Sequence, residues 1–457
     1  MGGAAGAAER AGDPYVPRLG NDGYRVESYD LKLDYRVASN RLEGVATIVA
    51  VATQRLRRFS LDLVKLRATR VRVDGVKVAH IGHAGDKLTM TPSTPVDAGA
   101  RFTVTVEYAG APAPRRSPWG PVGWEELTDG VIVAAQPSGA STWFPCNDHP
   151  AGKAPFRISV TVEQPYTVVC NGTLVRHTVS SGRGRWVYEQ TQPTATYLAT
   201  VQIGRYKTVH TDLAGVTGRL AYPVGIERRV MADFRPLDRM MALFERRFGP
   251  YPFDEFGVVV TADDLEIPLE AQGMAIFGAN HADGHGGSER LVAHELAHQW
   301  FGNSVGLAAW QHIWLNEGFA CYAEWLWSEE SGGMSTDACA RRFRGHLAGH
   351  PVGRAAGGTD DLVLADPGPE LMFDDAVYKR GALTLHALRL TIGDDAFFAL
   401  LRDWADAHRY GTVTTGDFTA LAGAYTDLSL DAFFEVWLGA HPLPELPQPT
   451  TRAAEVN

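Results

Sequence analysis

Apolar and polar residues alternate along the first half of the chain. Every second residue is apolar from Tyr29 to Val37 and again from Phe102 to Tyr108. A period of two places apolar side chains on one face of a strand and polar ones on the other. Turn signals such as Asp74-Gly75 and Asn171-Gly172 separate many such segments. From about Tyr24 to Ile203 the sequence therefore predicts an all-β domain of antiparallel sheets.

The pattern changes after about Arg205. Between Pro236 and Phe248 the apolar side chains recur on one side of a predicted helix that begins with a proline. The segment Phe256 to Thr261 predicts the last clear strand before the chain becomes helical at Ser288. Later helices are predicted at Asp395–Trp404 and Leu430–Leu438.

These patterns divide the chain into three parts. We expect an N-terminal β-sheet domain at residues 1–205, a mainly helical domain at 206–445 and a loose C-terminal tail at 446–457. The tail follows the proline-rich stretch Pro442 to Pro449, which cannot continue a helix. The predicted fold class is therefore α+β.

Composition and charge narrow the class of protein. With 457 residues and 45% apolar content the chain can bury sizeable cores. Its net charge of −10 argues against nucleic acids and anionic membranes as partners, because both are recognised by basic patches. No apolar run approaches the roughly 18 residues of a membrane-spanning helix. We expect no nucleic-acid and no membrane partner; the oligomeric state stays open.

The cysteines and the start of the chain bear on its location. The four cysteines show no C-x-x-C spacing, which fits reduced and mostly buried thiols. The first residues, Met1 to Ala5, lack the basic and leucine-rich regions of a signal peptide. We therefore expect a cytoplasmic protein, with a secreted form trimmed of its leader as the open alternative.

The segment His294-Glu295-Leu296-Ala297-His298 carries the strongest chemical signal. Two histidines four residues apart on a helix are separated by about 40° around its axis, so both imidazoles face one point. Glu295 lies between them and can act as a general base without binding the ion. This is the H-E-x-x-H pattern of zinc sites.

The surroundings of the motif favour a metal site over the alternative, a structural helix with hydrogen-bonded histidines. Apolar flanking residues at helical spacing place the motif on a buried helix. A second apolar helix from Trp314 to Trp325 carries Glu317 and Glu324 on one side. A buried carboxylate is costly unless it is paired or binds a metal. We therefore expect Glu317 to be the third ligand. Glu324 lies on the side of its helix from which it would support a ligating histidine, with a surface or core-edge glutamate as the alternative.

Longer motifs give the chain a family resemblance. The run H-E-L-A-H-Q-W-F-G-N from His294, followed by W-L-N-E-G-F-A around Glu317, resembles the M1 zinc aminopeptidases. These are gluzincins, related to aminopeptidase N and leukotriene A4 hydrolase. Residues 144–148, F-P-C-N-D, are similar to the family's F-P-C-x-D-E-P element, and Tyr378 stands where the family has its catalytic tyrosine. The resemblance covers most of the chain.

The resemblance implies a fold and a set of site residues. The expected fold is a β-domain followed by a thermolysin-like zinc metallopeptidase domain, without the long helical C-terminal domain of larger members. One Zn²⁺ per chain would be bound by His294, His298 and Glu317. Glu295 would serve as the base, and Tyr378 would donate a hydrogen bond to the oxyanion.

One departure from the family pattern concerns the substrate's amino group. The family's G-x-M-E-N motif is reduced here to Ile267-Pro268-Leu269-Glu270-Ala271, which keeps the glutamate. We expect Glu270 to bind the free N-terminal ammonium, because a carboxylate does so by charge-assisted hydrogen bonding. Gln136 resembles a family glutamine that lines the same pocket, with a structural role as its alternative.

These expectations leave three functions in order. The first is a zinc aminopeptidase that hydrolyses the N-terminal peptide bond of peptides. The second is an endopeptidase or an epoxide hydrolase on the same scaffold, because the G-x-M-E-N motif is altered. The third is a non-catalytic binding protein, which the complete set of ligands, base and tyrosine disfavours.

Overall fold

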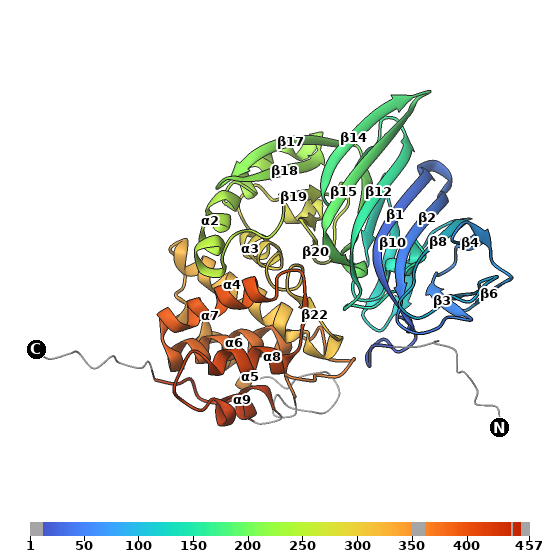
Figure 1. The fold of residues 1–457 in the computed structure, drawn as a ribbon. Helices are drawn as coiled ribbons and strands as arrows, with labels where there is room; N and C mark the ends of the chain where they lie inside the picture. The colour runs from blue at the N-terminus through green and yellow to red at the C-terminus, as the bar shows by residue number, and fades with distance from the viewer. Residues whose placement is uncertain (1–11, 350–361, 440–441, 449–457) are drawn as a thin grey trace, which may run out of the picture. The chain divides into compact units, whose positions relative to one another are not determined.

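The computed structural model describes residues 12–349, 362–439 and 442–448 (Figure 1). The chain divides into two compact units, the first formed by Met1–Asp233 and Phe253–Gly287, the second by Phe234–Pro252 and Ser288–Asn457. The domain boundary expected at residue 205 stays a prediction. The tail expected at 446–457 lies mostly outside the described residues.

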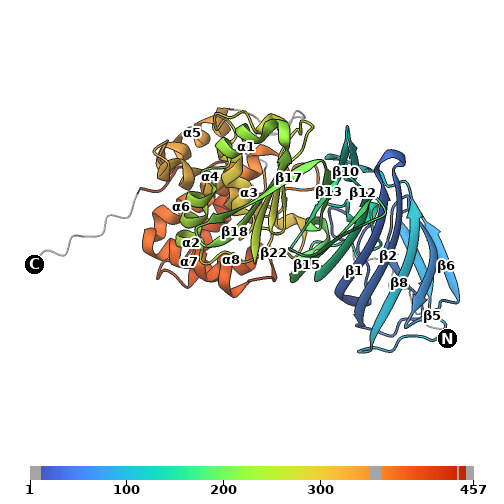
Figure 2. The ribbon, with the colours of Figure 1, turned by 90° about the horizontal axis from the view of Figure 1, so that it is seen from above.

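An eight-stranded sheet is the largest element of the first unit (Figures 1 and 2). Its neighbours pair antiparallel except β1 and β12, which are parallel. The predicted antiparallel β-domain is thus confirmed apart from that pair. In spatial order the strands are β14 (Thr173–Ser180), β15 (Arg183–Ala195), β12 (Lys153–Glu163), β1 (Tyr24–Arg36), β2 (Arg41–Ala52), β8 (Arg101–Gly110), β4 (Arg67–Val73) and β5 (Val76–Lys77).

The alternation read from the sequence is confirmed in this sheet. Tyr29, Leu31 and Leu33 of β1 are at most 2% exposed and face the core. The predicted turn at Asp74-Gly75 joins β4 to β5 with φ of 48° and 77°, the left-handed conformation that a two-residue hairpin turn requires. The sheet thus has one apolar and one polar face, and the apolar face builds the core of the unit.

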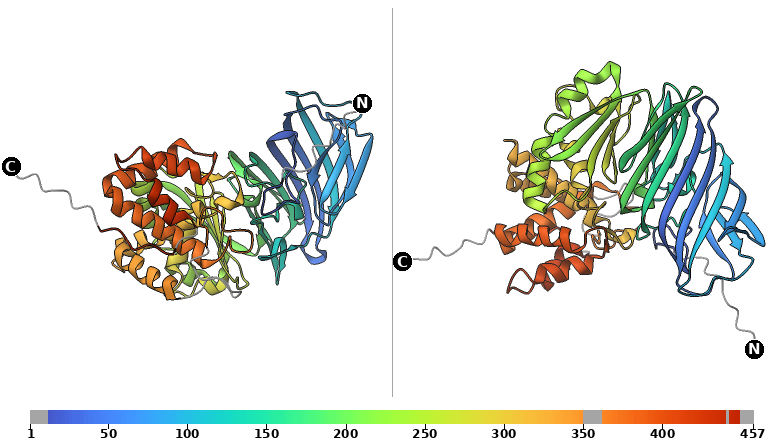
Figure 3. Two further views of the ribbon diagram at one scale, coloured as in Figure 1. Left: turned by 90° about the horizontal axis from the view of Figure 1, so that it is seen from below. Right: turned by 45° about the horizontal axis from the view of Figure 1, so that its top comes forward.

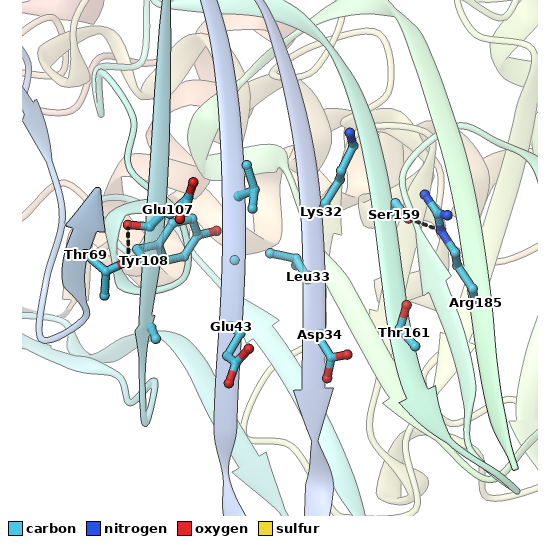
Figure 4. Close-up of a pocket in the computed structure, with 13 residues that line it drawn as sticks. Lys32, Leu33, Asp34, Glu43, Thr69, Glu107, Tyr108, Ser159, Thr161 and Arg185 are labelled. Atoms are coloured by element: carbon cyan, nitrogen blue, oxygen red, sulfur yellow. Dashed lines mark hydrogen bonds between the residues drawn. The ribbon is translucent and has the colours of Figure 1, made fainter. Parts of the chain in front are cut away.

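The polar face of the sheet is hollowed. The hollow measures about 610 Å³ and is lined by charged and hydroxyl side chains, including Lys32 and Asp34 of β1 and Arg185 of β15 (Figure 4). Arg185 donates to the hydroxyl of Ser159 on the neighbouring strand. None of the site residues predicted from the sequence lines this hollow.

Three smaller sheets complete the first unit, which Figure 3 shows in two further orientations. One has the order β13 (Thr167–Cys170), β16 (Val201–Gly204), β11 (Gly130–Ala134), β10 (Gly120–Leu127) and β9 (Arg115–Ser117). A three-stranded sheet contains β3 (Phe59–Asp62), β7 (Lys87–Thr91) and β6 (His80–Ala84). The last has the order β17 (Tyr206–Leu213), β18 (Val216–Pro223), β19 (Glu255–Val260), β21 (Met274–Phe277) and β20 (Leu269–Ala271), with α1 (Glu227–Asp233) after β18.

The last sheet corrects one expectation. The strand predicted from Phe256 to Thr261 is confirmed as β19, but it is not the last before the helices. The antiparallel pair β20 and β21 follows it and turns at Gly273, whose φ is +72°. At three and four residues these strands are too short for alternation to show in the sequence. β20 lies at the edge of the sheet and carries Glu270.

Helices dominate the described part of the second unit (Figure 1). The helices predicted at 236–248, 395–404 and 430–438 are confirmed as α2 (Leu237–Phe248), α7 (Asp394–Ala407) and α9 (Asp431–Leu438). Two short parallel strands, β22 (Gly306–Leu307) and β23 (Thr412–Val413), pair with each other and join two loops. The helices are α2 (Leu237–Phe248), α3 (Glu289–Ala297), α4 (Trp314–Glu330), α5 (Thr336–Gly349), α6 (Asp375–Ile392), α7 (Asp394–Ala407), α8 (Thr415–Gly423) and α9 (Asp431–Leu438).

Two expectations from composition can be compared with the structure. No helix among the described residues is long and apolar enough to cross a membrane. All four cysteines are buried and none forms a disulfide. The prediction that the cysteines are mostly buried is confirmed.

A pair of glycines sets the distance between α4 and α6. A Cβ on Gly381 would lie 2.7 Å from the Cα of Gly318, and a Cβ on Gly318 would lie 2.8 Å from the Cα of Gly381. Real Cβ atoms do not approach backbone so closely, so only glycine allows these helices to touch. Gly318 directly follows Glu317, and Gly381 lies one turn after Tyr378. The contact therefore fixes two predicted site residues relative to each other.

Candidate functional site

Three side-chain atoms converge in the second unit. The ligating atoms of His294, His298 and Glu317 all lie within 4.8 Å of one another, and all three side chains are buried. Oε2 of Glu317 is 3.5 Å from Nε2 of each histidine. α3 supplies His294, its C-cap supplies His298, and α4 supplies Glu317 from its first turn. The structure thus brings together the three residues that the sequence predicts as metal ligands.

Hydrogen bonds orient both imidazoles through their Nδ1 atoms. Nδ1 of His294 donates to Oε1 of Glu324 at 2.8 Å, and Nδ1 of His298 donates to the carbonyl of Phe301 at 3.1 Å. A proton on Nδ1 leaves the lone pair on Nε2, which is the atom that faces Glu317. Glu324 lies where the sequence analysis expected it, hydrogen-bonded to the imidazole of His294.

The local backbone makes room for this arrangement. After His298 the chain turns at Gly302, whose φ is +121°. A Cβ there would lie 3.3 Å from Nδ1 of His298 and 3.3 Å from the side-chain amide of Asn316. Glycine at this position lets the loop pass beside the His298 ring without displacing it.

The electrostatics of the pocket favour a positive charge at its centre. Burial lowers the pKa of His294, but hydrogen bonds to Glu317 and Glu324 raise it above the usual histidine value. Burial raises the pKa of Glu317, but the charge of a protonated His298 holds it well below its usual range. Two buried carboxylates beside two imidazoles form a group of side chains that is able to hold a cation.

The donor set fits a zinc ion. Catalytic zinc sites use three protein ligands of this kind, with bonds of about 2.0–2.1 Å. Two ligands on a tetrahedral ion with such bonds lie roughly 3.3 Å apart. The separations of 3.5 Å between Glu317 and the two histidines agree with that geometry. The hydrogen bonds at both Nδ1 atoms are those that metal-ligating histidines normally make.

The proposed base and tyrosine belong to the same unit. Glu295 lies on α3 between the two histidines and is 4% exposed. The ring of Tyr378 lies nearly parallel to that of His294, at 14° and with 6.0 Å between centroids. α6 begins at the N-cap Asp374, whose carboxylate accepts from the N–H of Ala376 and fixes the first turn, where Tyr378 stands.

The two predicted amine-binding residues meet in the first unit. Nε2 of Gln136 donates to Oε1 of Glu270 at 2.6 Å. Gln136 follows β11, and Glu270 lies on the edge strand β20, paired with Ala275 of β21. Both side chains are half-buried, and a carboxylate is able to accept several hydrogen bonds at once.

A buried amide holds β20 in place. Nδ2 of Asn171 donates to the carbonyls of Leu198 and Gln272, and its Oδ1 accepts from the N–H of Thr200. Asn171 is 1% exposed. The hydroxyl of Thr200 in turn donates to the carbonyl of Val133 in β11. These bonds connect the strand before Gln136 to the residue two after Glu270, and so fix the separation of the pair.

Two features of the site were missed from the sequence. Arg290 donates to the same carboxylate oxygen of Glu324 that accepts from His294. The sequence does indicate that Arg290 lies on the same helix face as His294, because the two residues are four apart on one helix. The Asn171 contacts had no sequence signal beyond the predicted Asn-Gly turn, since its partners are distant backbone groups.

Two protein-family models match this chain, one in its N-terminal part and one in its C-terminal part. Residues 25–198 match the Peptidase M1 N-terminal domain, and residues 236–437 match the Peptidase family M1 domain. Aminopeptidase M1 of Arabidopsis thaliana is 25% identical over 326 residues, which cover 67% of this chain and 36% of that protein. Aminopeptidase 2 of Candida albicans is 23% identical over 437 residues, 90% of this chain and 46% of that protein. The chain spans half the length or less of the curated relatives it matches.

Solved structures match over nearly the whole chain. A mutant M1 zinc metallopeptidase of Deinococcus radiodurans, bound to a Tyr-Ser-Ala substrate, superposes with a TM-score of 0.86 at 29% identity. The match covers 97% of this chain and 100% of that one. Another structure, of the M1 zinc metallopeptidase from the same organism, gives a TM-score of 0.84 at 29% identity. The expected β-domain followed by a helical metallopeptidase domain is thereby confirmed, and the chain belongs to peptidase family M1.

Proposed function

We propose that this protein is a zinc-dependent aminopeptidase that hydrolyses the N-terminal peptide bond of peptides. The convergence of His294, His298 and Glu317 within 4.8 Å is the observation that carries the proposal. The names of its relatives, aminopeptidases and M1 zinc metallopeptidases, support it. One Zn²⁺ per chain would be held by these three residues.

A zinc ion held by these three residues would supply the chemistry of the reaction. When bound, zinc polarises the scissile carbonyl and lowers the pKa of a water molecule towards 7. Glu324 and the carbonyl of Phe301 keep the two imidazoles oriented during that chemistry, because each accepts the Nδ1 proton of one ring.

Glu295 is the proposed proton carrier. Its carboxylate takes the proton of the attacking water and delivers it to the nitrogen of the departing amine. Its place on α3 between the two proposed ligands favours this role, because it holds the buried carboxylate beside the proposed metal site. Tyr378 would donate its phenolic hydrogen to the carbonyl oxygen as that oxygen becomes negative.

The Gln136–Glu270 pair would recognise the substrate's free amino group. The Glu270 carboxylate accepts from Gln136 at 2.6 Å, which holds it in one orientation. An ammonium group bound to this carboxylate would fix the substrate one residue from its end. This step distinguishes an aminopeptidase from an endopeptidase on the same scaffold.

The decisive experiment compares substrates with free and blocked amino groups. A panel of aminoacyl-coumarins and their N-acetylated counterparts would be incubated with the zinc-loaded protein, with and without a chelator. Chelator-sensitive release from the free-amine substrates alone would support the proposal and reveal the preferred side chain. Cleavage of the blocked substrates would favour the endopeptidase instead. No cleavage of either set by protein carrying one zinc would refute the peptidase assignment for these substrates.

A further inference from the structure

One oxygen atom of Glu324 accepts two hydrogen bonds from the same face of α3. Nη1 of Arg290 and Nδ1 of His294 both lie 2.8 Å from Oε1. The two donors stand four residues apart, one turn of the helix, so they reach a single acceptor on α4. Arg290 thus contacts the group that orients a proposed metal ligand.

The charge of Glu324 needs a partner. Its side chain is 3% exposed, and an uncompensated buried carboxylate is strongly unfavourable. His294 contributes no net charge when it is neutral, as a metal ligand must be. Of the lysines and arginines in the described chain, Arg290 alone forms an ion pair with Glu324.

A second cation, Lys379, influences Glu324 by its charge but makes its direct contacts with other residues. Nζ of Lys379 donates to Sγ of Cys321 at 3.3 Å and lies 3.6 Å from a carboxylate oxygen of Asp375. It also stands 4.9 Å from the centre of the Phe343 ring. Lys379 acts on Glu324 through space, whereas Arg290 fixes the direction of the carboxylate oxygen.

We propose that Arg290 is a positioning residue of the zinc centre. By holding Glu324 against His294, Arg290 helps the centre to retain its metal. Without the guanidinium, the carboxylate loses the bond that aims Oε1 at Nδ1, and His294 loses its fixed ring orientation. Second-shell partners of metal ligands typically change metal affinity by about 10–100-fold. The inference rests on the zinc centre of the proposed function but is independent of the substrate and the reaction.

The arginine's surroundings make it testable. Its side chain is 56% exposed, so its replacement leaves no buried cavity. Arg246 is a matched control: it pairs with Glu330 on the same helix α4 at 2.9 Å and is also 56% exposed, but it has no link to the three ligands. The variants are Arg290→Gln, Arg290→Lys and Arg246→Gln.

The measurement is the release of zinc from fully loaded protein into a chromogenic chelator. We expect Arg290→Gln to release zinc about 10-fold faster than the parent protein. Arg290→Lys should recover part of the loss, because an ammonium replaces the charge but not the planar geometry. Arg246→Gln should match the parent both in zinc release and in the unfolding temperature of the zinc-free protein.

A double substitution tests whether Arg290 affects zinc release through Glu324. In a Glu324→Gln background, Arg290→Gln should change zinc release less than 2-fold, because its acceptor has lost its charge. Equal release rates for Arg290→Gln and Arg246→Gln would overturn the inference, as would an equal effect of Arg290→Gln in both backgrounds. A parent protein that binds no zinc would instead refute the zinc centre itself, which separates the two failures.

Discussion

Gly318 and Gly381 bring the helix that carries Glu317 into backbone contact with the helix that carries Tyr378. A Cβ on Gly381 would come within 2.7 Å of the Cα of Gly318. One glycine directly follows the proposed ligand and the other lies one turn after the proposed tyrosine. The spacing between the proposed metal ligand and the proposed hydrogen-bond donor is thus set by two residues without side chains.

Replacing Gly381 with alanine should separate the two helices. The added methyl group must displace backbone, and overpacking of this kind typically costs about 1–3 kcal/mol. A shift of about 1 Å at a catalytic group can lower the rate about 100-fold. We expect lower kcat and a lower unfolding temperature in Gly381→Ala. In Gly345→Ala, where nothing lies within 4 Å of the new Cβ, activity should be unchanged. Equal activities of both variants would contradict the role of the contact.

Removing the hydroxyl of Tyr378 should impair the chemical step rather than binding. Loss of one oxyanion donor lowers kcat by about 100-fold or more. Tyr378→Phe should therefore lower kcat with little change in KM. Tyr425→Phe is the matched control, since its hydroxyl bonds to Asp403 outside the proposed site. Full activity of Tyr378→Phe would remove the tyrosine from the mechanism.

The amine anchor predicts a selective loss. Glu270→Gln keeps the shape of the side chain and removes its charge, so substrates with a free amino group should bind more weakly. A hydrogen bond to a charged group is worth about 1.5–3 kcal/mol, which corresponds to a KM roughly 10- to 150-fold higher. The exposed Glu266→Gln serves as the control. Unchanged KM in Glu270→Gln would leave the amino group without its proposed anchor.

Asn171 should matter for stability. Its side chain makes three buried hydrogen bonds to backbone groups, and alanine would leave those groups unsatisfied. Each unsatisfied buried group costs about 1–3 kcal/mol, so Asn171→Ala should lower the free energy of unfolding by about 3 kcal/mol. Asn280 also bonds twice to backbone but is exposed, and Asn280→Ala should cost less than about 1 kcal/mol. Denaturant unfolding would measure both, and similar losses would contradict the importance of burial here.

Regular patterns made much of the fold predictable. The alternation from Tyr29 to Val37 marks β1, because one face of a sheet is buried and the other is not. The apolar side of α2 marks a helix for the same reason. The short strands β20 and β21 were missed, because the segment Met274–Phe277 is buried on both faces and shows no alternation.

The candidate site was predictable where chemistry imposes local spacing. His294 and His298 share a helix face by sequence distance alone, and Glu317 lies at the start of a recognisable second helix. The Gly318–Gly381 contact and the Asn171 bonds join segments far apart in the chain. Nothing in one sequence states which distant backbone groups will meet, so these tertiary relationships required the structure.

The central claim is that one zinc ion is held by His294, His298 and Glu317. Crystals of the zinc-loaded protein, measured on both sides of the zinc absorption edge, test it most directly. A single anomalous difference peak within bonding distance of Nε2 of both histidines and a carboxylate oxygen of Glu317 is the predicted result. A peak bound by other residues, or no peak at these three atoms in zinc-loaded crystals, would contradict it.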